Sequence, residues 1–159
     1  MIALITGIFG QDGSYLTELL HGMGYEIHGI EKEPLQQHAF LLQDHLRKKN
    51  ISPVLHSCDL RSYESVRHLI HELKIDECYH LAAVHYPSET ATTERIRVDK
   101  QLFEDNTIST LNLLYAIHEV SPDTKFVLAG SCFMYDAVKE FPQNENTSFR
   151  SKSVYGFQK

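Results

Sequence analysis

The chain has 159 residues, of which 42% are apolar and 23% charged, as in a soluble globular domain of average size. Its 15 Lys and Arg against 21 Asp and Glu give a formal net charge of -6, which excludes a basic surface for nucleic acid. Three cysteines without C-x-x-C spacing argue against zinc and disulfides, and no basic leader or long apolar run indicates secretion or a membrane span. Composition predicts a cytoplasmic α/β domain over residues 1–159, with no nucleic acid, membrane or metal as partner.

Short β-rich runs alternate with longer amphipathic stretches, which is the pattern of a parallel sheet with crossover helices. In chain order we expect a strand at residues 2–6, a helix at 14–23, a strand at 25–31, a helix at 34–50 and a strand at 54–58. There follow a helix at 62–74, a strand at 78–83, helical material over 92–120, a strand at 126–129 and a loop at 136–152. Five strands joined by right-handed crossovers predict a doubly wound parallel sheet of order 3-2-1-4-5, the Rossmann fold.

A glycine-rich turn joins the first expected strand to the first expected helix. Gly7 makes the tight exit turn, Gly10 lets the backbone approach a pyrophosphate, and Gly13 lets the helix pack close to the sheet. The helix N-terminus adds free N–H groups and partial positive charge, so the turn predicts a dinucleotide site rather than an ordinary strand–helix connection. The residues expected to contact the dinucleotide here are Gly7, Phe9, Gly10, Gln11, Asp12 and Gly13.

Acidic residues after the second and third expected strands fit the adenosine half of such a cofactor. Glu31 ends the second strand, where a carboxylate accepts hydrogen bonds from the ribose hydroxyls. Asp59 and Leu60 follow the third strand, where the adenine base would lie. Because Glu31 and Glu33 would repel a 2′-phosphate, the expected cofactor is NAD, with NADP as the alternative since Lys32 lies between them.

Tyr155 and Lys159 are four residues apart on an expected helix, so the ammonium group can lie beside the phenol and stabilise its phenolate. A tyrosine with a lowered pKa can act as a general base near neutral pH. Ser131 follows the fifth strand, where active-site groups of such sheets collect. Chance spacing of two common residue types is the alternative interpretation of the pair.

Together these features resemble the extended short-chain dehydrogenase/reductase family, and within it the GDP-mannose 4,6-dehydratases. The resemblance runs along the whole chain and rests on Ala3-Leu4-Ile5-Thr6-Gly7, Gly10-Gln11-Asp12-Gly13-Ser14-Tyr15-Leu16, Gly24-Tyr25-Glu26, His28-Gly29-Ile30, Asp59-Leu60, Leu81-Ala82-Ala83, Pro142-Gln143-Asn144-Glu145-Asn146-Thr147 and Tyr155 with Lys159. It implies oxidation at carbon 4 of a GDP-mannose-like nucleotide sugar by a bound nicotinamide cofactor. It also implies that full-length relatives are homo-oligomers.

By position, the resemblance assigns Tyr155 as the base for the sugar 4-hydroxyl and Lys159 as the group that lowers its pKa and holds the nicotinamide ribose. It assigns Ser131 as the hydroxyl that bonds the sugar oxygen. The further cofactor contacts that it implies are Leu81, Ala82, Ala83 and Asn106, with Tyr155 and Lys159. His85, which follows the Leu-Ala-Ala stretch closely, is a further candidate to contact the substrate.

The chain departs from the family pattern in ways that bear on function. Phe133 stands where the dehydratases carry a glutamate that removes the C5 proton, and it is expected to be an apolar packing residue. The family's C-terminal sugar-nucleotide domain has no counterpart in these 159 residues. Two alternatives to a dehydratase therefore stay open. One is a 4-epimerase or oxidoreductase without dehydratase activity, and the other is a catalytically silent, truncated NAD-binding module.

Two expectations concern the surface. The remainder of the family fold would cover an apolar stripe of Leu111, Leu114, Tyr115 and Ile117, so this stripe is expected to be partly bare. Cys132 is expected to be a small buried residue rather than a thiol nucleophile, because no basic partner lies near it in the sequence.

Overall fold

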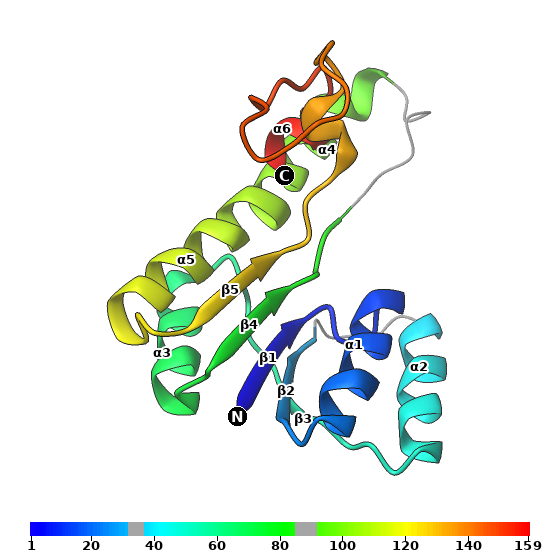
Figure 1. The fold of residues 1–159 in the computed structure, drawn as a ribbon, viewed down its shortest axis with the longest axis vertical. Helices are drawn as coiled ribbons and strands as arrows, with labels where there is room; N and C mark the ends of the chain where they lie inside the picture. The colour runs from blue at the N-terminus through cyan, green and yellow to red at the C-terminus, as the bar shows by residue number, and fades with distance from the viewer. Residues whose placement is uncertain (32–36, 85–91) are drawn as a thin grey trace. The chain divides into compact units, whose positions relative to one another are not determined.

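Figure 1 shows the computed structural model of the chain, which describes residues 1–31, 37–84 and 92–159. Its strands are β1 (Ile2–Thr6), β2 (Glu26–Ile30), β3 (Val54–His56), β4 (Glu77–His80) and β5 (Lys125–Leu128). Its helices are α1 (Gln11–Gly22), α2 (Gln37–Lys48), α3 (Tyr63–Leu73), α4 (Thr92–Leu102), the π-helix η1 (Phe103–Ile108), α5 (Ser109–Val120), the 3-10 helix η2 (Cys132–Tyr135) and α6 (Val154–Gln158).

The chain divides into two compact units, which are described separately. The sheet unit comprises Met1–Ala83 and Ser109–Ala129, and the small unit comprises Val84–Ile108 and Gly130–Lys159. The expectation of one incomplete domain over residues 1–159 remains a prediction.

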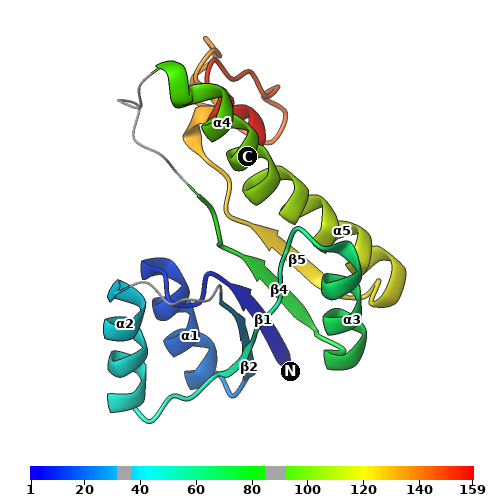
Figure 2. The same cartoon turned by 180° about the vertical axis from the view of Figure 1, so that it is seen from behind.

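Five parallel strands in the order β3-β2-β1-β4-β5 form the sheet unit, which confirms the predicted topology. β1 lies in the centre, where Leu4 aligns with His28 of β2 and with Cys78 of β4. Helices α1 and α2 cover one face of the sheet, and α3 and α5 cover the other (Figures 1 and 2). Alternate residues of β1 therefore enter different cores, with Ala3 and Ile5 on one side and Leu4 on the other.

Several element boundaries differ from the expected ones, and two of the differences have identifiable reasons. Helix α1 begins at Gln11, because the Gly10 carbonyl already accepts the Ser14 N–H at 3.0 Å. Strand β4 ends at His80, because the Ala82 N–H donates to Thr6 Oγ1 at 3.1 Å and leaves the strand ladder. The expected helix over 92–120 is the succession α4, η1 and α5, while residues 34–36 of the expected second helix lie outside the described residues.

In the small unit, the π-helix η1 holds a buried asparagine that is bonded to the segment after β4. The Asn106 amide accepts the Val84 N–H at 2.8 Å and donates to the Val84 carbonyl at 3.0 Å. Single π-turns within helices recur at functional sites, where they redirect a side chain. Among the described helices, none is long and apolar enough to cross a membrane.

A hydrogen-bonded histidine pair joins β2 and β3 within the sheet unit. His28 Nδ1 lies 2.8 Å from His56 Nε2 with nearly parallel rings, and Glu26 Oε1 lies 3.1 Å from His28 Nε2. Burial, together with the neighbouring His28, lowers the pKa of His56 below its ordinary value. The folded protein therefore favours a neutral His56.

We expect the His28–His56 pair to lower the free energy of unfolding of the protein at acidic pH. The unfolded chain binds a proton at His56 near pH ~6.5, whereas the folded chain binds it only at lower pH, so stability declines as the pH drops below that value. Between about pH 7.5 and about pH 5.5 the melting temperature should fall a few degrees further than in His56→Gln, which cannot titrate. If the melting temperatures of the unaltered protein and of His56→Gln fell equally, other titrating groups would be responsible for the acid sensitivity.

Candidate functional site

The glycine turn between β1 and α1 is packed so tightly that side chains are excluded from it. Gly7 has a φ of 68°, and a Cβ there would lie 3.0 Å from the Ala82 backbone. A Cβ on Gly13 would collide with the carbonyl oxygens of Gly7 and Ile8, whereas a Cβ on Gly10 would lie 3.1 Å from the Gly7 oxygen. Phe9 is only 1% exposed, so its side chain is part of the core and is not available to a ligand at this turn.

The N-terminus of α1 follows this turn directly. Gly10 is the N-cap and no side chain caps the helix, while Gln11 and Asp12 are exposed in its first turn. An uncapped helix N-terminus presents N–H groups and partial positive charge, which together suit a phosphate group. The geometry therefore fits the role predicted for the turn.

A buried hydrogen-bond network behind the turn was not predicted from the sequence. Thr6 Oγ1 lies 2.7 Å from His80 Nδ1 and also accepts the Ala82 N–H, and both side chains are buried. This network connects Thr6, the last residue of β1, to Ala82, which follows β4. It thereby holds Ala82 against Gly7. The position of Thr6 directly before Gly7 is the sequence signal that could have indicated this network.

The predicted adenosine residues lie on two neighbouring strand ends. The Ile30 carbonyl accepts the Gly7 N–H at 3.3 Å, so the end of β2 contacts the glycine turn and Glu31 is the next residue along the chain. Asp59 forms a bidentate ion pair with Arg61, with Nε–Oδ1 2.9 Å and Nη2–Oδ2 3.0 Å. Any adenine contact by Asp59 would thus share its carboxylate with Arg61. Lys32 lies outside the described residues.

Ser131 in the small unit is the N-cap of η2. Its Oγ accepts the Phe133 N–H at 3.2 Å, and its own N–H lies 3.5 Å from Met134 Sδ. Because the hydroxyl oxygen is used as an acceptor by this turn, the hydroxyl proton is oriented away from it. Ser131 can therefore donate to another oxygen.

Tyr155 lies on α6, which packs directly against η2. Ser153 caps α6 by accepting the Gly156 N–H at 3.0 Å. A Cβ on Gly156 would collide with the Phe133 carbonyl, so only glycine allows this approach of the two backbones. The rings of Phe133 and Tyr155 meet edge to face, with centroids 6.4 Å apart. Lys159 follows as the C-cap, and burial lowers the pKa of its ammonium group.

The remaining predicted residues have mixed outcomes. Asn106 is buried with its amide held by Val84, and His85 lies outside the described residues. Cys132 is exposed, so the expectation that it is buried was wrong, because η2 turns its side chain outward instead of into a core. Cys78 is the buried cysteine, and burial raises its pKa to about 12.

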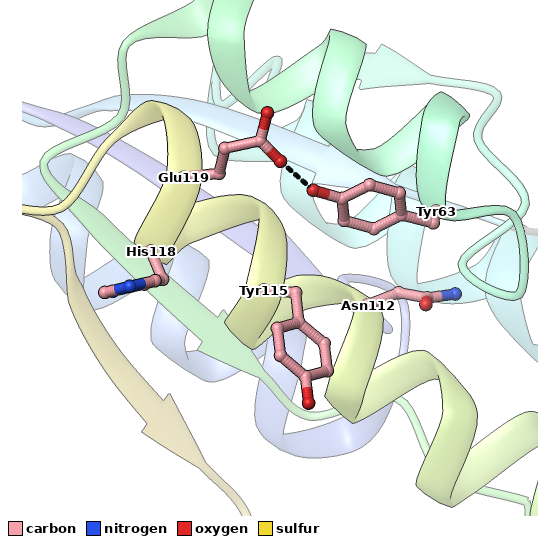
Figure 3. A pocket seen from close by; sticks show the side chains of 5 residues that line it. All are labelled: Tyr63, Asn112, Tyr115, His118 and Glu119. Atoms are coloured by element: carbon pink, nitrogen blue, oxygen red, sulfur yellow. Dashed lines mark hydrogen bonds between the residues drawn. The ribbon is translucent and has the colours of Figure 1, made fainter.

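A separate hollow of about 530 Å³ lies between α3 and α5 in the sheet unit, shown in Figure 3. Glu119 bridges the two helices there, accepting from the Tyr63 hydroxyl and from Arg67 Nε. The predicted apolar stripe lies on α5. Its residues Leu111, Leu114 and Tyr115 are exposed and Ile117 is buried against the sheet, so the stripe is partly bare, as expected. None of the predicted cofactor or catalytic residues lines this hollow.

A parallel 3-2-1-4-5 sheet, a glycine turn between β1 and α1, and a Y-x-x-x-K pair after β5 define the class of Rossmann-fold short-chain dehydrogenases/reductases. Within this class, the chain belongs to the GDP-mannose 4,6 dehydratase family, whose sequence profile matches residues 4–159.

Two relatives carry the name of this family. The chain is 36% identical over 165 residues to a GDP-mannose 4,6-dehydratase of Vibrio cholerae, covering 99% of this chain and 42% of that protein. It is 34% identical over 162 residues to the human GDP-mannose 4,6 dehydratase, covering 98% and 42%. The chain thus spans less than half the length of these relatives.

Two solved epimerases share the fold. A UDP-glucose 4-epimerase of Stenotrophomonas maltophila with bound NAD has a TM-score of 0.79 at 23% identity, covering 99% of this chain and 45% of that one. The UDP-glucose 4-epimerase of Bifidobacterium longum, solved with NAD+ and UDP, has a TM-score of 0.79 at 21% identity and the same coverage.

Proposed function

We propose that this chain is the cofactor-binding part of an enzyme that uses NAD to oxidise carbon 4 of a nucleotide-linked hexose. The observation that carries the proposal is the packing of Tyr155 on α6 against the η2 turn that Ser131 caps. The names of the relatives and the NAD-bound fold neighbours support it. A cytoplasmic location, and homo-oligomers for full-length relatives, remain predictions.

The sheet unit fits a dinucleotide, because a Cβ on Gly13 would fill the turn and no side chain caps α1. In such a site Gly7, Gly10 and the first N–H groups of α1 would hold the pyrophosphate. Glu31 would bind the adenosine ribose, with Asp59 and Leu60 near the adenine. Further contacts in this unit would come from Leu81, Ala82 and Ala83, while Asn106 of the small unit is another proposed contact. When bound, NAD supplies the acceptor for the hydride that leaves carbon 4.

The small unit would handle the proton. As a phenolate, Tyr155 takes the proton of the sugar 4-hydroxyl while the C4–H bond gives up its hydride, which leaves a ketone at carbon 4. Lys159, the C-cap of α6, would hold the nicotinamide ribose. Ser131 donates a hydrogen bond to the same sugar oxygen, since its acceptor side is engaged by the Phe133 N–H.

Phe133 favours chemistry that stops at carbon 4. Loss of the C6 hydroxyl needs a base for the C5 proton, and a phenyl ring cannot provide one. Without a positioned base, proton abstraction forgoes a factor of about 10²–10⁴. An oxidoreductase or 4-epimerase therefore fits this site better than a dehydratase.

Cofactor selection tests the first half of the proposal. Calorimetry should give tighter binding of NAD than of NADP, because the Glu31 carboxylate would accept from the ribose hydroxyls and repel a 2′-phosphate. Glu31→Gln should reduce the preference by about tenfold, which corresponds to about 1.4 kcal/mol. Glu145 is exposed, so Glu145→Gln serves as the matched control and should retain the preference for NAD over NADP. Tighter binding of NADP by the unaltered protein would overturn the assignment of Glu31.

A further inference from the structure

We propose that Gln158 is a positioning residue, which holds the C-terminal end of α6 in the place that Tyr155 and Lys159 need for the oxidation. The inference rests on the proposed function, because it takes Tyr155 as the base and Lys159 as the residue that would hold the nicotinamide ribose. It concerns the small unit alone, and it starts from the hydrogen bonds that join α6 to α4 and η1.

Helix α6 has five residues, too few to be stable by its own hydrogen bonds, so its place depends on its neighbours. Its N-terminal end is held by the Ser153 cap and by Gly156, which packs against η2. Apolar burial does little at the other end, since Phe157 is 80% exposed. The contacts that hold the C-terminal end therefore decide where Lys159 lies.

Gln158 makes these contacts with both its side chain and its backbone. It is only 6% exposed, and its Nε2 donates to the carbonyl of Asp99, in the last turn of α4, at 3.2 Å. Its own carbonyl accepts from Thr107 Oγ1 of η1 at 3.3 Å. One residue thus joins α6 to two successive helical segments, and α6 lies beside α4 (Figure 1). Lys159 is the next residue, so its backbone is fixed by the same bonds.

Stability alone does not explain a glutamine at this position. Its Oε1 is buried and has no hydrogen-bond partner among the residues that the structure describes. Burying an acceptor without a donor is unfavourable, and a methionine of similar length would avoid that cost. The bond from the amide N–H group to α4 is what the glutamine adds over such an apolar side chain.

Gln158→Met separates positioning from stability. At saturating NAD, the kcat for NADH formation from GDP-mannose or UDP-glucose should fall about 10–100-fold, because a misplacement of about 1 Å in a reacting group has an effect of this size. The KM for the sugar should change little, and the melting temperature should stay equal or rise. Gln101 is exposed on α4, so Gln101→Met is the matched control and should leave kcat and melting temperature unchanged.

A second pair of variants tests the bond to η1. Thr107→Val removes the hydroxyl that donates to the Gln158 carbonyl, whereas Thr107→Ser keeps a hydroxyl there. We expect kcat to fall about 2–10-fold in Thr107→Val, as for the loss of one hydrogen bond, and to be restored in Thr107→Ser. An equal kcat in the two variants would contradict the contribution of η1.

Calorimetry with NAD and with ADP gives a measurement that does not require turnover. ADP lacks the nicotinamide ribose that Lys159 would hold, so Gln158→Met should weaken the binding of NAD about 2–10-fold and leave that of ADP unchanged.

Three results would each overturn the inference while sparing the proposed function. They are an unchanged kcat in Gln158→Met, an unchanged ratio of NAD to ADP affinity, and a melting temperature that falls together with kcat. If the unaltered protein bound NAD but oxidised neither sugar, the proposed function would fail instead, and the ratio of the two affinities would decide the inference by itself.

Discussion

Replacing Gly10 with valine is expected to abolish NAD binding while the protein stays folded. A Cβ at this position would already lie 3.1 Å from the Gly7 carbonyl, and the two methyl groups of valine would project above the turn where the pyrophosphate is proposed to lie. Titration calorimetry should show a dissociation constant for NAD at least about 100-fold higher, equivalent to about 2.7 kcal/mol.

Gly22→Val is the matched control for this substitution. Gly22 lies at the other end of α1, and a Cβ there meets nothing within 4 Å. This variant should bind NAD as the unaltered protein does, and both variants should unfold at similar temperatures. Unchanged affinity in Gly10→Val would place the pyrophosphate away from this turn.

The sheet order could be predicted because each strand carries its own signal. β1 and β2 are short apolar runs bounded by glycine-rich or polar segments, and right-handed crossovers leave few ways to arrange five parallel strands. The glycine turn was equally local, because Gly7, Gly10 and Gly13 are fixed by spacing within one strand–helix connection. Short-range patterns of this kind transfer directly from sequence to structure.

The contacts that complete the site are long-range, and sequence spacing does not contain them. Thr6 meets His80 across 74 positions, and Phe133 meets Tyr155 because Gly156 lets two backbones approach. The π-helix that holds Asn106 was predicted only as ordinary helix, since the periodicity of apolar residues does not distinguish one extra residue in a turn. Each of these features depends on packing between elements.

Removing the phenol of Tyr155 is expected to have the largest effect on turnover. Tyr155→Phe keeps the ring that packs on Phe133 but removes the group proposed to take the proton of the sugar 4-hydroxyl. The kcat for formation of NADH from NAD and a nucleotide-linked hexose such as GDP-mannose should fall about 10²–10⁴-fold. The affinity for NAD should change little, because the pyrophosphate and adenosine contacts proposed for the sheet unit are untouched.

Tyr135→Phe is the matched control, since it removes a phenol from the same small unit at a ring that packs on Phe149. It should retain turnover close to that of the unaltered protein. If Tyr155→Phe and Tyr135→Phe were equally active, another group would be the base. If the unaltered protein bound NAD but turned over none of the nucleotide sugars, these residues would mark ancestry only, and the chain would act as a silent NAD-binding module.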